Sequence, residues 1–142
     1  MNLSDKVSKY FTLKEAIWLP KLNRAADASD GLTEAIVDNI KQIAVVLDVI
    51  REFFGKPIVV HCWFRPEAYN ALVNGAKKSM HLSALAVDFE IKGISCDDAK
   101  KMLIDGNKLE ELNLRMEDNG IGSGWIHLDI RAPGPGGRFF KP

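Results

Sequence analysis

The longest regular pattern of apolar positions lies in the first half of the chain. From Leu32 the apolar residues recur every three or four positions up to Phe54, which is followed by Gly55 and Pro57. This spacing puts them on one face of a helix, and a glycine followed by a proline is typical of a helix end. The pattern predicts a long amphipathic helix over residues 32–54.

Three shorter helices are indicated by their end signals. Thr12 and Glu15 have the spacing of a capping box, so a helix should begin at Thr12. Pro66 suits the first position of a second helix, which should end at residues 74–75, Asn-Gly. Ser95 is an N-cap for a third helix that should run to about residue 105.

The apolar period changes from 3.6 to 2 in three later segments, residues 57–65, 84–91 and 124–131. Such alternation is typical of half-buried strands. The third strand should form a hairpin with residues 112–117, because Asp-Asn-Gly at 118–120 is turn sequence. We therefore expect an α+β fold in which a small antiparallel sheet packs on the long helix.

Each of the three strands has one apolar face and one face that bears reactive side chains. The reactive faces carry His61, Trp63 and Arg65 in the first strand, Asp88 in the second, and Trp125, His127, Asp129 and Arg131 in the third. Cys62 is expected on the apolar face of the first strand. If the apolar faces pack on the long helix, the reactive faces form one wall of a cleft.

A possible metal site follows when the loop before the second strand is included. His81 lies in that loop, and with Asp88 and His127 it gives two imidazoles and one carboxylate. These ligands suit zinc, and three protein ligands leave a position for water, as in catalytic zinc sites. The residues alone leave other interpretations open, because single histidines are often core residues and strand aspartates are often solvated.

Composition and charge narrow the classes of function. The 142 residues, with 46% hydrophobic and 27% charged, suit one globular domain spanning residues 1–142. Nineteen basic and nineteen acidic side chains balance, so we expect no nucleic-acid or membrane partner. No segment resembles a membrane span or a signal peptide. We expect a cytoplasmic monomer with reduced cysteines.

Several segments resemble a family of zinc peptidases. Residues 79–88, Ser-Met-His-Leu-Ser-Ala-Leu-Ala-Val-Asp, resemble the Ser-x-His-x-x-Gly-x-Ala-x-Asp signature of zinc D-alanyl-D-alanine carboxypeptidases and phage L-alanyl-D-glutamate endopeptidases. Residues 125–129 resemble their Trp-x-His-x-Asp ending, residues 64–70 their Tyr-Arg-Ser-Pro-x-Tyr-Asn segment, and residues 10–15 their opening. The chain is similar to the peptidase C-terminal-domain type, common in phages and prophages, and the group is structurally akin to the hedgehog signalling domain.

The resemblance implies a Zn²⁺ ion held by His81, Asp88 and His127 and an amide hydrolysis by metal-activated water. A carboxylate must then move the proton of that water. Glu117 is one candidate, because several relatives carry their catalytic glutamate just ahead of the last strand. Asp129 is the other, since it lies two residues after a proposed ligand on the same face.

Further roles follow from the same resemblance. Arg65 matches the family's arginine and would stabilise an oxyanion. Ser79, His61 and Trp63 are candidate substrate contacts, although His61 and Trp63 stand where relatives carry small residues. Ala84 replaces the signature glycine, which matters only if its φ is positive.

The implied substrate is a peptidoglycan stem peptide. The enzyme would be an endolysin that cuts an L-Ala-to-D-Glu bond, released to the cell wall during phage lysis, or a D-Ala-D-Ala carboxypeptidase. A different class of function is a zinc-containing binding or virion structural domain that has kept the fold and lost catalysis. A third alternative is an interaction domain without metal, in which the two histidines would lie far apart.

Overall fold

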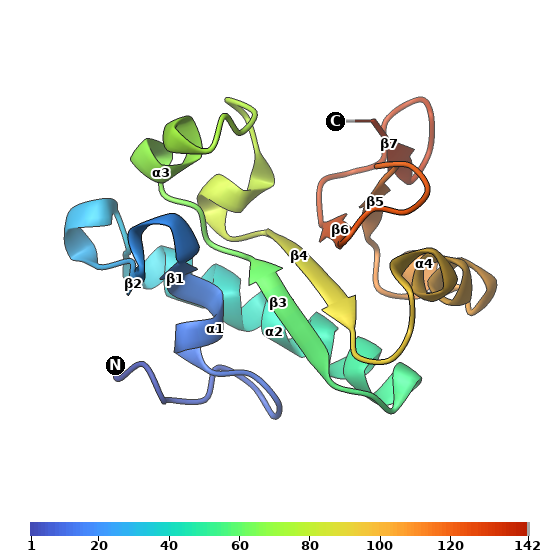
Figure 1. Cartoon of the computed structure of the whole chain (residues 1–142), viewed down its shortest axis with the longest axis horizontal. Coiled ribbons are helices and arrows are strands. Elements are labelled where there is room, and N and C mark those ends of the chain that lie inside the picture. Colours follow the sequence, from blue (N-terminus) through green and yellow to red (C-terminus); the bar gives the residue numbers. More distant parts are fainter. Residues whose placement is uncertain (142) are drawn as a thin grey trace.

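The computed structural model describes residues 1–141, and its longest element is the helix α2 (Glu34–Phe54). Thr33 caps its start by accepting a hydrogen bond from the backbone N–H of Ile36, and Gly55 ends it with φ of 64°. The helix buries one face, formed by Ile40, Ile43, Ala44, Leu47, Ile50 and Phe54. Figure 1 shows α2 crossing behind the strands β3 and β4. The predicted long helix is confirmed, with a start two residues later than expected.

A five-stranded sheet packs in front of α2. Its strands, in spatial order, are β3 (Ile58–Cys62), β4 (Ala86–Ile91), β6 (Ile126–Asp129), β5 (Arg115–Glu117) and β7 (Phe139–Phe140). The first four are antiparallel, whereas β7 pairs in parallel with β5. The α+β class, the small antiparallel sheet and the hairpin are confirmed. β7 was not foreseen, because the tail that contains it has no apolar alternation.

Smaller elements surround this core. The helices are α1 (Leu13–Ile17), α3 (Glu67–Leu72), α4 (Cys96–Asp105) and α5 (Lys108–Glu111), with short 3-10 turns η1 (Pro20–Leu22), η2 (Ala28–Asp30) and η3 (Met80–Ser83), and a two-stranded ribbon of β1 (Trp18–Leu19) and β2 (Arg24–Ala25). The capping box at Thr12 is present, as its pattern predicts. No helix within residues 1–141 is both long and apolar enough to cross a bilayer.

A bulge in β3 changes the faces expected for its second half. The register with β4 shifts between Val60 and Cys62. One extra residue reverses the direction of every later side chain in a strand. Cys62 therefore lies beside Asp88 instead of in the core, and Trp63 turns inward, where it is 1% exposed. The predictions that Cys62 is a core residue and that Trp63 faces the cleft are both wrong.

The turn η3 delivers one histidine to the edge of the sheet. Ser79 caps it by accepting a hydrogen bond from the backbone N–H of His81 at 3.2 Å, and the carbonyl of His81 accepts one from the backbone of Arg65 at 2.9 Å. The turn ends at Ala84, whose φ is 62°. A left-handed backbone carries a steric penalty for alanine that glycine avoids, so the replacement of the signature glycine introduces local strain.

Candidate active site

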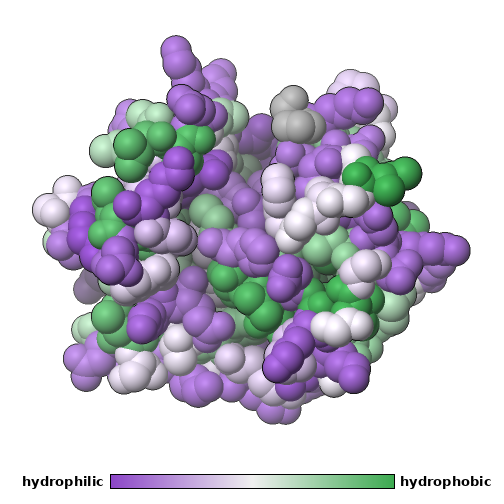
Figure 2. All heavy atoms as spheres, viewed as in Figure 1, coloured by the Kyte–Doolittle hydropathy of each residue, from purple (hydrophilic) through white to green (hydrophobic). Residues whose placement is uncertain are grey.

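A cavity of about 360 Å³ opens over the ends of β4, β5 and β6. Its lining includes Arg65, Lys78, Ser79, His81, Asp88, Glu117, Trp125, His127, Asp129, Arg131 and Phe140. Figure 2 looks onto this face, which is hollowed between the α3 side and the β7 side, with mostly hydrophilic residues around the hollow. Polar groups thus converge in the place predicted for the cleft.

Two histidines and one aspartate meet at the floor of this cavity. Asp88 Oδ1 lies 3.2 Å from His81 Nε2 and 2.8 Å from His127 Nδ1. The two imidazole rings are 5.1 Å apart between centroids. Both histidines are buried, while the Asp88 carboxylate keeps partial exposure toward the cavity. The structure therefore brings together the three residues that the sequence pattern singled out as ligands.

The outer nitrogen of each imidazole has its own acceptor. His81 Nδ1 donates to the carbonyl of Trp63 at 2.8 Å, and His127 Nε2 donates to Asp129 Oδ2 at 3.2 Å. These contacts leave His81 Nε2 and His127 Nδ1 as the two ring nitrogens that face Asp88. Acceptors of this kind orient the ligating histidines of metal sites, so the donor set fits a divalent cation such as zinc.

The charges of the cluster shift the pKa values of its members. Burial disfavours the charged form of His81, but the adjacent Asp88 carboxylate outweighs it and raises the histidine pKa to about 10. Burial likewise opposes protonation of His127, yet hydrogen bonds to Asp129 and Asp88 raise its pKa. The pKa of Asp88 is lowered, since the two imidazoles outweigh its burial. A metal ion would compete with protons for this site.

A second set of donor atoms overlaps with the first. Cys62, His81 and Asp88 each offer one ligand atom, and these atoms lie within 4.8 Å of one another. Cys62 Sγ is 3.9 Å from His81 Nδ1, the nitrogen that already donates to the carbonyl of Trp63. A thiolate is a good zinc ligand. The thiol therefore contacts the ring nitrogen that is turned toward the Trp63 carbonyl, and not the nitrogen that faces Asp88.

The two candidate bases have different surroundings. Glu117 Oε2 lies 3.7 Å from His127 Nδ1, and within residues 1–141 its carboxylate accepts no hydrogen bond. Asp129 is 2% exposed, and Arg115 binds both of its oxygens at 2.9 Å. Burial opposes ionisation of Asp129, but its hydrogen bonds with His127 and Arg115 prevail and lower its pKa to about 2. Of the two candidate bases, Glu117 is the one whose carboxylate has no hydrogen-bond partner among residues 1–141.

Arg65 and Ser79 line the opposite wall. Arg65 Nη2 donates to Ser79 Oγ at 3.2 Å, while Arg65 Nε is buried without a hydrogen-bond partner. A buried donor without an acceptor is costly in a folded protein unless a ligand or water satisfies it. Both residues thus occupy positions from which they can contact a bound molecule, as expected from the sequence.

Two predicted substrate contacts lie elsewhere. Trp63 is packed in the core, where its ring meets Phe11 edge-on and its Nε1 donates to the carbonyl of Ala84 at 3.2 Å. His61 is paired with Glu90 at 3.3 Å and borders a separate hollow beside α1. Neither lines the cavity over β4 and β6. The structure therefore places neither residue where the expected contact with substrate could form.

Sequence reasoning did not single out Arg115 or Phe140. Arg115 lies two positions before Glu117 on the same strand, so the alternation of β5 could have placed it at the site. Its guanidinium carbon is 3.8 Å from the centre of the Phe140 ring, which itself meets His127 edge-on. Phe140 comes from the tail, where no pattern indicated a strand.

Comparison with known families agrees with this geometry. Residues 11–129 match the family described as peptidase M15. The chain belongs to the peptidase M15 family. M15 peptidases are zinc-dependent, so a zinc cofactor for this M15 domain follows from its family and from the donor set. No curated protein and no solved structure gave a significant match.

Proposed function

We propose that this M15 domain is a zinc peptidase that hydrolyses amide bonds in peptidoglycan stem peptides. His81, Asp88 and His127 are its metal ligands, and Glu117 is its general base. The observation that carries the proposal is the convergence of both imidazoles on Asp88 Oδ1, with each outer ring nitrogen held by its own acceptor. A histidine–aspartate cluster that only stabilises the fold needs no further carboxylate beside it. Here the Glu117 carboxylate borders the same cavity, which favours a catalytic role for the cluster.

Each residue then has a distinct part in the reaction. Bound zinc lowers the pKa of a coordinated water and polarises the scissile carbonyl. The Glu117 carboxylate takes a proton from the attacking water and passes it to the leaving amine. Asp129 keeps the His127 ring in one orientation. Arg65 provides a fixed positive charge beside the oxyanion that develops on the carbonyl, which requires no proton transfer.

The charge around the cavity supports an anionic substrate. Arg65, Lys78 and Arg131 line it, and Arg131 Nη2 donates to the carbonyl of Lys78 at 2.6 Å, which fixes the arginine at the rim. Lys141 also lines this rim. Stem peptides carry several free carboxylates, so a basic rim suits them in spite of the zero net charge of the whole chain.

Within this class we propose the endolysin activity, cleavage of the L-Ala-to-D-Glu type bond by a phage or prophage enzyme. The similarity of the chain to the peptidase C-terminal-domain type, which is common in phages and prophages, supports it. A D-Ala-D-Ala carboxypeptidase would use the same metal and base. The two activities differ in the termini they create, which makes them separable by product analysis.

Incubation with purified peptidoglycan, with and without a chelator, tests the proposal. Mass spectrometry should detect new amino and carboxyl termini that depend on zinc. Release of D-alanine alone would identify a carboxypeptidase. Zinc bound in equimolar amount without any released product would identify a non-catalytic binding domain, and absence of both zinc and product would contradict the proposal altogether.

A further inference from the structure

The loop between β5 and β6 joins two parts of the proposed catalytic centre. It begins directly after Glu117 and ends at Trp125, two residues before His127. Three glycines occur in it at every second position, at residues 120, 122 and 124. The first two have φ of 81° and 78°. Glycine gives a chain maximal backbone freedom, so a loop of this sequence needs external contacts to hold one conformation.

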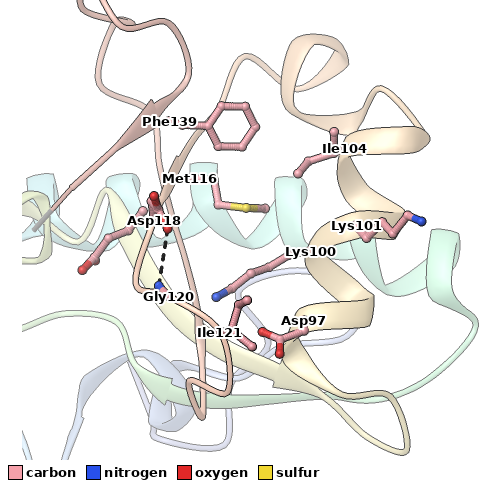
Figure 3. Close-up of a pocket in the computed structure, with 10 residues that line it drawn as sticks. Asp97, Lys100, Lys101, Ile104, Met116, Asp118, Gly120, Ile121 and Phe139 are labelled. Carbon is pink, nitrogen blue, oxygen red and sulfur yellow. Dashed lines mark hydrogen bonds between the residues drawn. The ribbon is translucent and has the colours of Figure 1, made fainter.

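The helix α4 supplies those contacts through two side chains one turn apart. The Asp97 carboxylate accepts hydrogen bonds from the backbone N–H of Gly122 at 3.2 and 3.0 Å. Lys100 Nζ donates to Asn119 Oδ1 and, at 2.9 Å, to Ser123 Oγ. Figure 3 shows the Lys100 side chain extending from α4 toward the loop at Gly120.

The contacts continue from the loop to the catalytic cavity. Asn119 Nδ2 donates to the carbonyl of Trp125 at 3.1 Å, so the amide that Lys100 holds also fixes the backbone of a cavity-lining residue. At the other end, the backbone N–H of Asp118 donates to the carbonyl of Phe140 at 2.6 Å. Lys100 itself does not line the catalytic cavity; it borders a neighbouring cavity of about 510 Å³ between α4 and the loop.

The hairpin does not need this lysine for its register. β5 and β6 are paired at Arg115 with Asp129 and at Met116 with Leu128, and both pairs lie on the far side of Glu117 from the loop. Met116 and Leu128 are buried in the core. The strands are therefore fixed by packing, and Glu117 is paired with Phe140 of β7. The loop beyond Asp118 is tied to α4 through Asn119, Gly122 and Ser123.

We propose that Lys100 is a positioning residue of the peptidase, which sets the place of Trp125 and limits the movement of the chain next to Glu117 by clamping the glycine-rich loop onto α4. The inference rests on the proposed function. Its physical basis is that a proton-transfer carboxylate must be placed within a fraction of an ångström, and a misplacement of about 1 Å costs as much as a hundredfold in rate. A cation with two loop acceptors restricts that movement without touching substrate or metal.

The test is kinetic and uses the zinc-loaded full chain with soluble stem peptide. Lys100→Met should lower kcat by roughly tenfold to a hundredfold, with a smaller change in KM, unchanged zinc content and faster amide hydrogen exchange in residues 118–125. Lys100→Arg keeps donors for both acceptors and should restore most of kcat. Lys101→Met is the matched control, because Lys101 is an exposed neighbour on α4 without a hydrogen bond or ion pair within residues 1–141.

Each outcome decides one part of the argument. A Lys100→Met variant with wild-type kcat, or one that loses zinc, overturns the positioning role. Should that variant fail to fold, Asn119→Ala combined with Ser123→Ala removes the Lys100 contacts from the loop side, together with the hydrogen bonds of both residues to the Trp125 carbonyl, and must give at least the same loss of kcat. An inactive wild-type chain overturns the proposed function instead. Even if the wild-type chain is inactive, an unchanged rate of amide hydrogen exchange in residues 118–125 of Lys100→Met would contradict the clamp.

Discussion

The guanidinium of Arg115 binds the carboxylate of Asp129 through two parallel hydrogen bonds, Nε to Oδ1 and Nη2 to Oδ2, both 2.9 Å long. Paired donors of this kind fix a carboxylate in position and orientation. Because Asp129 Oδ2 also accepts a hydrogen bond from His127 Nε2, the arginine reaches the proposed metal ligand through the aspartate. This geometry supports the proposal that Asp129 orients His127 and that Glu117 is the base.

Replacement of Asp129 tests its assignment as a support for His127. Asp129→Asn should weaken zinc binding by roughly tenfold to a hundredfold, because the acceptor that orients the imidazole becomes a weaker one. Competition with a fluorescent zinc chelator measures the change. Wild-type zinc affinity combined with a large loss of kcat would instead mark Asp129 as the base.

Replacement of Glu117 should have the opposite effect, a loss of kcat with unchanged zinc binding. Glu117→Gln keeps the shape of the side chain but cannot accept the proton of the attacking water, so kcat should fall by about a hundredfold or more. Zinc content, measured by elemental analysis, should remain that of the wild type. Zinc loss in this variant would show that Glu117 is a ligand.

Removal of Arg115 should reduce stability more than removal of the whole pair. Arg115→Met leaves the Asp129 carboxylate, 2% exposed, with only His127 and the backbone N–H of Arg131 as partners within residues 1–141, and loss of one member of a buried ion pair costs about 3–5 kcal/mol. Adding Asp129→Asn to the same chain should recover part of that free energy of unfolding. Both variants should be compared by chemical denaturation without metal, so that zinc binding does not contribute. Equal stability of the single and double variants would contradict the pairing.

The strain at Ala84 can be measured against a matched alanine. Ala84 and Ala86 are both 0% exposed, but only Ala84 has positive φ. Ala86→Gly should destabilise the fold by about 1 kcal/mol or more, through lost methyl burial and added freedom of the unfolded chain. At Ala84 the relief of roughly 1–2 kcal/mol of left-handed strain offsets those costs. Denaturation should therefore show a much smaller change for Ala84→Gly, and equal losses at the two positions would exclude strain.

The sequence predicted the parts of this fold that depend on local patterns. The apolar repeat up to Phe54 defines α2, and alternation identifies three of the five strands and puts Asp88 and His127 on their polar faces. These features follow from the helix and strand periods alone. Alternation also placed Asp129 near the site, whereas His81 and Glu117 gained their proposed roles from the resemblance to the zinc peptidases, and neither source separated the roles of Glu117 and Asp129.

The features that were missed depend on contacts between distant segments. The bulge after Val60 arises from the pairing of β3 with β4. It turns Cys62 toward Asp88 and Trp63 toward the core, the reverse of the faces predicted for them. β7 forms in a tail without alternation, because the edge of β5 offers it a partner. The role of Asp129 depends on Arg115 across the hairpin, and no local spacing reveals such a partner.

The two overlapping donor sets give the last prediction, since they differ in only one ligand. His81 and Asp88 belong to both sets, whereas Cys62 belongs to one and His127 to the other. If His127 is the third ligand, His127→Ala should abolish equimolar zinc binding, while Cys62→Ala should retain it together with activity. The physical reason is that His81 Nε2 faces Asp88, whereas the thiol contacts His81 Nδ1, which already donates to the carbonyl of Trp63.

Cobalt substitution provides an independent measurement of the same question. A thiolate ligand gives Co²⁺ an intense charge-transfer absorption in the near ultraviolet, which imidazole and carboxylate ligands do not produce. The wild-type chain and Cys62→Ala should therefore have the same cobalt spectrum. A thiolate band that disappears in Cys62→Ala, together with loss of the metal, would assign the ion to Cys62, His81 and Asp88. Glu117 would then lie beside a histidine that does not bind the metal, and its role as the base would have to be abandoned.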